Sequence, residues 1–95
     1  MFYNISMVTP LGTRKGSMEV EIENGTINGY LTIFSNRNQF KGKIDDNNHC
    51  ELTGRFKTLV KEHLYTAQGF IHPRELSLKL HTNGREYSLT GVVSK

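Results

Sequence analysis

The stretch Ile27-Asn28-Gly29-Tyr30-Leu31 places a glycine at the centre of a segment in which apolar and polar residues alternate. Alternate side chains of a β-strand point to the same face, so Gly29 would share the face of Ile27 and Leu31. A glycine on the buried face of a strand lets a sheet bend sharply, or lets another backbone come close. The same arrangement recurs around Gly42, Gly54, Gly69 and Gly91. These glycines predict a small, strongly bent sheet.

Turn-forming residues divide this pattern into about eight short strands. Asn24-Gly25 and Asn83-Gly84 are hairpin signals, because asparagine and glycine tolerate the positive φ angles of a type I′ turn. We expect a basic loop through residues 14–16, a third strand from Thr26 to about Phe34, and a turn at residues 35–38. Residues 58–63 fit either a helical turn or a longer hairpin.

Strand parity separates an inner set of residues from an outer one. The expected inner residues are Tyr3, Ile5, Met7, Val20, Leu31, Phe40, Leu52, Leu78 and Leu89. The expected outer residues are Glu19, Glu21, Lys41, Lys43, Arg55 and Lys79.

The connections between these strands are too short for helical crossovers, so each strand should pair with its sequence neighbour. An open meander would leave two edges and a wide face uncovered, and closure removes both problems. The predicted fold is all-β: a closed or nearly closed antiparallel up-and-down meander barrel of about eight short strands. A sandwich of two sheets is the alternative.

A chain of 95 residues predicts one domain, residues 1–95. No apolar run is long enough to cross a bilayer, and the N-terminus opens directly into strand-like alternation. We therefore expect a cytoplasmic protein without a membrane partner, unless a leader has been trimmed. The formal net charge of +3 permits weak contact with anions but does not by itself indicate nucleic acid.

Catalytic and metal-binding arrangements are not evident in the sequence. Cys50 is the single cysteine, and its neighbour His49 should point to the opposite face of the strand. The histidines lack zinc-site spacing, and Glu19, Glu21 and Glu23 share a solvated outer face. The segment Gly12–Gly16 precedes a strand, so it lacks the helix N-terminus of a phosphate loop and is read as an exposed loop. We expect no enzyme activity, no metal and no cofactor.

The chain resembles a group of small barrels through the order of its turns and glycines. The matching residues are Thr9-Pro10-Leu11-Gly12, Gly16, Asn24-Gly25, Ile27-x-Gly29-x-Leu31, Asn38-x-Phe40-x-Gly42, Cys50-x-Leu52-x-Gly54, Tyr65-x-Ala67-x-Gly69 and Tyr87-x-Leu89-Thr90-Gly91. This order resembles small bacterial β-barrel domains of the streptavidin-like or calycin-like type. The resemblance implies a shape; no biotin site transfers, because the chain has no tryptophan.

The expected function is that of a binding or accessory module for a partner protein or a small apolar ligand. Barrels of this size either pack solid or hold one small ligand. We expect a small, mostly apolar cavity near one barrel end, lined by Tyr65, Tyr87, Phe40 and Phe56.

The alternative function is single-stranded nucleic-acid binding on an outer face. Basic residues on two neighbouring strands should cluster there, beside aromatic residues on the third. The predicted surface is Tyr30, Phe34, Lys41, Lys43, Arg55 and Lys57. An exposed aromatic pair such as Tyr30 and Phe34 can equally mark a homodimer contact.

Overall fold

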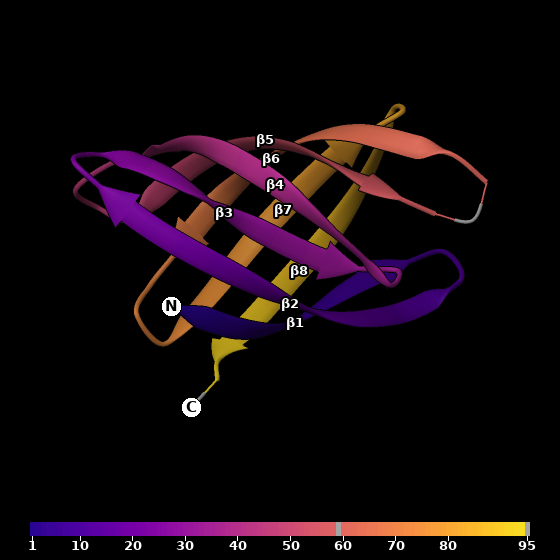
Figure 1. Cartoon of the computed structure of the whole chain (residues 1–95), viewed down its shortest axis with the longest axis horizontal. Helices are drawn as coiled ribbons and strands as arrows, with labels where there is room; N and C mark the ends of the chain where they lie inside the picture. The colour runs from indigo at the N-terminus through magenta and orange to yellow at the C-terminus, as the bar shows by residue number, and fades with distance from the viewer. Residues whose placement is uncertain (59, 95) are drawn as a thin grey trace.

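Eight strands follow one another around a closed barrel in this computed structural model, which describes residues 1–58 and 60–94 (Figure 1). The strands are β1 (Phe2–Thr9), β2 (Gly12–Glu23), β3 (Thr26–Ile33), β4 (Asn36–Ile44), β5 (His49–Lys57), β6 (Glu62–Ile71), β7 (Glu75–Thr82) and β8 (Arg85–Val93). Every strand pairs antiparallel with the next, and β8 pairs antiparallel with β1. The predicted closed up-and-down meander is confirmed, and the two-sheet sandwich is wrong.

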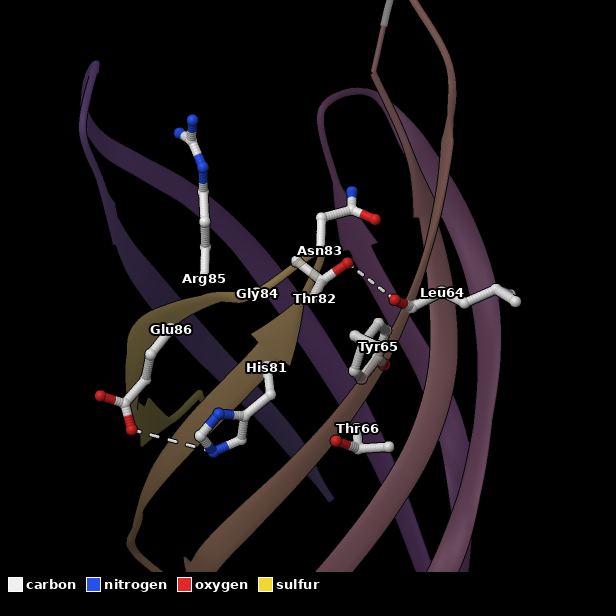
Figure 2. Close-up of a pocket in the computed structure, with 9 residues that line it drawn as sticks. All are labelled: Leu64, Tyr65, Thr66, His81, Thr82, Asn83, Gly84, Arg85 and Glu86. Carbon is white, nitrogen blue, oxygen red and sulfur yellow. Dashed lines mark hydrogen bonds and ion pairs between the residues drawn. The ribbon is translucent and has the colours of Figure 1, made fainter.

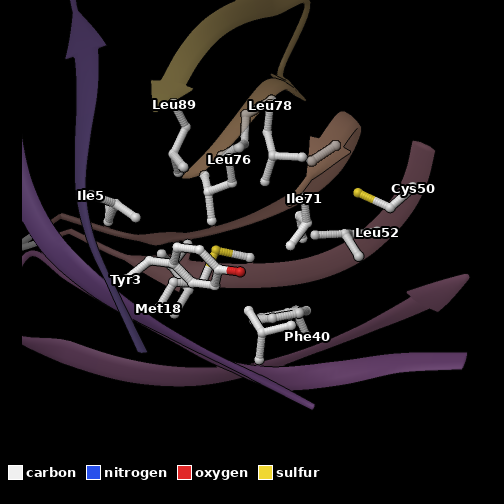
Figure 3. Packing of buried hydrophobic residues seen from close by; sticks show 14 of the residues in the cluster. Tyr3, Ile5, Met18, Phe40, Cys50, Leu52, Ile71, Leu76, Leu78 and Leu89 are labelled. Carbon is white, nitrogen blue, oxygen red and sulfur yellow. The ribbon is translucent and has the colours of Figure 1, made fainter. Parts of the chain in front are cut away.

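The parity prediction is also confirmed. All the residues expected on the inner face are buried, and those expected outside are exposed except Glu19, which is half-buried. Side chains from strands all round the barrel converge on one interior (Figure 3). Tyr3 lies near one end of that interior, and its hydroxyl donates to the carbonyl oxygen of His72 over 2.6 Å.

Large and small residues alternate around the inner wall. Phe40 is paired with Gly29 on β3 and with Gly54 on β5. Ile5 is likewise paired with Gly16 on β2 and with Gly91 on β8. The side chain of each large residue occupies the space that its glycine neighbours leave, which is how a strongly coiled sheet fills its core.

Two local expectations need correction, and one open alternative is decided. β2 begins at Gly12, so residues 14–16 are paired with β1 instead of forming a loop, and Gly16 is an inward glycine opposite Ile5. β3 ends at Ile33, and the turn is formed by Phe34 and Ser35, whose φ angles are 54° and 63°. Of the two alternatives for residues 58–63, the longer hairpin is confirmed: β5 and β6 are paired as far as Lys57–Glu62, and the amide of Thr58 donates to the carbonyl of Lys61 over 3.0 Å. Leu59 lies outside the described residues.

The barrel has two different ends. The β1–β2, β3–β4, β5–β6 and β7–β8 turns share one end, here the hairpin end, and both termini lie toward the other (Figure 1). At the hairpin end the β5–β6 hairpin projects beyond its neighbours. The β4–β5 ladder stops at Phe40–Gly54 and the β6–β7 ladder at Thr66–His81, whereas β5 and β6 stay paired as far as Lys57–Glu62.

Candidate binding site

The residues predicted to line an internal cavity lie on the inner side of the barrel. Phe40, Phe56 and Tyr65 are buried, and Tyr87 is partly buried against the core. A Cβ atom at Gly54 would lie 2.5 Å from the Tyr65 hydroxyl and 3.1 Å from the Phe40 Cβ. The two aromatic side chains therefore occupy the space beside this glycine. The hollows found in the described part of the chain open to the surface instead.

Aromatic rings close the interior at the hairpin end. The Phe56 ring stacks on Phe34 at 5.7 Å and on His63 at 5.0 Å, and lies 5.9 Å from the ring of Tyr65. Burial raises the pKa of the Tyr65 phenol, so this hydroxyl stays protonated. Phe34 was expected on the outer face, and that position is wrong: its place in the turn directs the ring onto the core.

A cleft opens where β6 separates from β7 (Figure 2). The cleft has a volume of about 580 Å³ and is lined by Leu64, Tyr65, Thr66 and residues 81–86. Two side-chain hydrogen bonds span the separation. The Thr82 hydroxyl donates to the Leu64 carbonyl over 2.7 Å, and the side chains of Asn83 and His63 are joined over 2.9 Å.

A second hollow, the trough, crosses the outside of the barrel. Its central row of directly paired residues runs Lys41–Thr53–Thr66–His81 from β4 to β7. The two threonines are short, whereas Lys43, Glu51 and Gln68 stand on the neighbouring row and border the same hollow, whose volume is about 700 Å³. The trough and the cleft adjoin, because both are lined by Thr66 and His81, and together they are called the outer depression here.

The predicted basic and aromatic surface is divided by acidic residues. Lys41 and Lys43 border the trough, but Arg55 lies on the projecting hairpin and binds Glu62 at 3.2 Å. Lys57 also lies on that hairpin, opposite Glu62.

The predicted aromatic pair is not available for stacking as a unit. The Arg37 guanidinium lies 3.7 Å above the centre of the Tyr30 ring and binds Glu19 at 2.6 Å. Phe34 faces the core. Covering one face of Tyr30 and burying part of Phe34 removes much of the platform on which bases would stack.

The side chains with chemical reactivity are either buried or open to solvent. Cys50 is buried, and desolvation, followed by the charge of Asp45, raises its thiol pKa to about 11. Thr66, His81 and Glu86 are directly paired across β6, β7 and β8, in the order that a nucleophile, a base and an acid would take. There the His81 Nε2 lies 3.8 Å from the Glu86 Oε1, beyond hydrogen-bond distance, and both side chains are about half exposed.

Residues 1–58 and 60–94 contain neither a metal-binding cluster nor a helix that could span a membrane. No group of three or more histidine, cysteine, aspartate or glutamate residues there is placed to hold a metal ion. That part of the chain also contains no helix with the length and apolarity that a membrane crossing requires.

No protein-family model matches this chain, and searches of curated proteins and of solved structures find no significant match. The fold by itself defines the class of the protein, which is a closed, eight-stranded antiparallel barrel.

Proposed function

We propose that the protein is a non-catalytic binding module that holds an extended segment of a partner protein in its outer depression. One observation carries the proposal. Phe40, Phe56 and Tyr65 are buried in the interior where a ligand was expected, whereas the outer depression, made of the adjoining trough and cleft, is an open hollow. Binding sites are concave and combine apolar surface with a few convergent polar groups, as this hollow does.

The lining residues indicate the chemistry of the bound segment. Thr53 and Thr66 form a low floor, and their hydroxyls can donate to and accept from a peptide backbone. Lys41 and Lys43 stand on the β4 side, where they would attract a carboxylate. The fitting partner is an extended segment with small side chains over the threonines and an acidic residue toward the lysines.

The absence of catalysis is part of the proposal. The Cys50 thiol is buried with a raised pKa, and neighbouring strand positions keep His49 on the other face. His81 and Glu86 are open to solvent, which weakens any activation of Thr66.

The proposal also includes the kind of barrel that the chain resembles. An eight-stranded meander supports a likeness to streptavidin-like or calycin-like bacterial barrels, and the likeness extends to binding as a role. The cytoplasm is the proposed location, and a free, buried cysteine fits a reducing compartment.

The experiment is a selection of peptides from a random library on the full chain, followed by NMR titration of the selected peptides. We expect an acidic consensus and chemical-shift changes at Lys41, Thr53 and Thr66. Thr66→Arg fills the floor and should abolish binding. The matched control is Thr13→Arg, which alters an exposed strand threonine outside the depression and should leave binding unchanged.

Three results would overturn the proposal. Shift changes centred on Phe56, Tyr65 and Tyr87 with small apolar compounds would establish an internal carrier instead. Salt-dependent binding of single-stranded oligonucleotides through Lys41 and Lys43 would favour the nucleic-acid alternative. Selected peptides that bind Thr66→Arg as well as the parent would place the site elsewhere.

A further inference from the structure

The outside of the barrel carries its charge unevenly. The outer surfaces of β2–β5 present charged side chains such as Glu19, Glu21, Lys41, Lys43, Glu51 and Arg55. The opposite surface, here the neutral face, is formed by Asn4, Ser6, Val8, Phe70, Glu75, Ser77, Lys79, Ser88, Thr90 and Val92. Glu75 and Lys79 are the charged residues in this set, and Lys15 borders it on β2, where its ammonium donates to the Ser6 hydroxyl over 3.4 Å. Covering this face would therefore desolvate few ionic groups.

Apolar side chains are exposed on the neutral face. Val8, Phe70 and Val92 are 56%, 46% and 59% exposed. The Phe70 ring is held between His49, at 5.4 Å, and His72, at 6.1 Å, so it presents a fixed surface. Between Phe70 and Val92 lies a hollow of about 430 Å³, whose floor includes Ser77 and Thr90. An aromatic side chain beside a hollow is a typical anchor for a protein partner.

The charges on this face are arranged symmetrically. Glu75, Ser77 and Lys79 are successive outward positions of β7, with the serine midway between the two charges. At about 3.4 Å per residue, the Cα atoms of Glu75 and Lys79 stand roughly 7 Å on either side of that of Ser77. The Lys79 ammonium donates to the Ser88 hydroxyl on β8 over 3.0 Å and would have to turn from it to reach the second copy. A two-fold axis lying in the interface, across β7 at Ser77, would place Glu75 of each copy opposite Lys79 of the other.

The same axis is compatible with the apolar residues. Phe70 is the direct neighbour of Ser77 on β6, so it lies along the axis and would meet the Phe70 of the second copy beside the hollow. A two-fold interface requires a surface that is complementary to itself, and both the charges and the aromatic residue meet that requirement.

We propose that the neutral face docks a second copy of this chain, giving a two-fold homodimer centred on Ser77 with reciprocal Glu75–Lys79 ion pairs and a central Phe70 contact. The two sheets pack face to face, as in a β-sandwich. This dimer uses a different surface from the predicted contact at Tyr30 and Phe34.

Charge reversal tests the axis directly, by sedimentation velocity on the full chain at concentrations on the order of 100 µM, well above the micromolar Kd range of a weak dimer. The parent should sediment as a dimer. Glu75→Lys and Lys79→Glu should each give a monomer, because like charges would then meet twice. The double variant Glu75→Lys/Lys79→Glu restores opposite charges and should restore the dimer. Phe70→Ser should give a monomer.

Glu21→Lys, a charge reversal at an exposed position of β2 outside both the neutral face and the outer depression, is the matched control and should remain dimeric. Circular dichroism spectra of all variants should coincide, because every altered side chain is exposed. A monomeric parent, a dimer that survives both single reversals, or a double variant that stays monomeric would overturn the proposal.

Discussion

The ring of Phe40 lies over Gly29, its direct partner on β3: a Cβ atom at Gly29 would stand 3.0 Å from the Phe40 Cζ. It would also overlap the carbonyl oxygen of Glu19 on β2. The glycine thus meets two needs at once, because it lets the β2 backbone come close and leaves space for an aromatic ring. Gly54 differs, since its nearest neighbours are the side chains of Tyr65 and Phe40.

This difference predicts which glycine substitutions can be compensated. Gly29→Ala and Gly54→Ala should each lower the free energy of unfolding by about 1–3 kcal/mol through overpacking. Tyr65→Leu should recover part of the loss at Gly54, because the obstacle there is a side chain. Phe40→Leu should recover nothing at Gly29, because the Glu19 carbonyl remains. Urea unfolding of each double-mutant cycle measures the coupling, and equal recovery at both glycines would contradict this account.

Cys50 should be unreactive in the folded protein. Burial first, and then Asp45, raises its thiol pKa to about 11 from an ordinary value of 9.0. Alkylation by iodoacetamide at pH 8 should be slow and should become fast in urea, because the thiolate is the nucleophile. Rapid labelling without denaturant would show that the thiol is accessible.

The same shift predicts a dependence of stability on pH. The folded state holds the thiol proton more tightly than the unfolded state does, so this contribution is complete below about pH 9 and is lost as the pH rises toward 11. Cys50→Ala should therefore flatten the fall of Tm between pH 8.5 and 10. An unchanged slope in thermal unfolding would contradict the assignment.

Thr82 should control how firmly the projecting hairpin is held. Its hydroxyl donates to the Leu64 carbonyl over 2.7 Å across the separation between β6 and β7. Thr82→Val should reduce stability by about 1 kcal/mol, and amide hydrogen exchange should rise at residues 62–64. Thr53→Val changes an exposed threonine and serves as the control. Uniform exchange changes around the whole barrel would argue against a local role.

Tyr30 should contribute nothing to nucleic-acid binding. Arg37 covers one face of its ring and is itself bound to Glu19, so base stacking would have to break both contacts. Fluorescence anisotropy with single-stranded DNA or RNA at low salt should show no binding at about 10 µM protein, within the range of ordinary non-specific affinity. If the parent binds and Tyr30→Ala binds more weakly, Tyr30 does stack on bases and this prediction is wrong.

The strand parity and the inner glycines could be predicted because they depend on local properties. Alternation of period two places Phe40 inside and Lys41 outside whatever the neighbouring strands do. Short polar connections exclude helical crossovers, and a long meander with no covering helix is completed most simply by closure. The fold class and the buried residues could therefore be predicted from the sequence.

The candidate sites depended on register and on the ends of strands, which local patterns do not determine. Thr53 and Thr66 form the floor of the trough because the β5–β6 ladder pairs them directly, and nothing near either threonine in the sequence specifies that alignment. Phe34 faces inward because β3 ends one residue earlier than its apolar pattern suggests. The tertiary structure also decided that Phe40 and Tyr65 fill the barrel, since whether the space beside a glycine stays open depends on side chains from other strands.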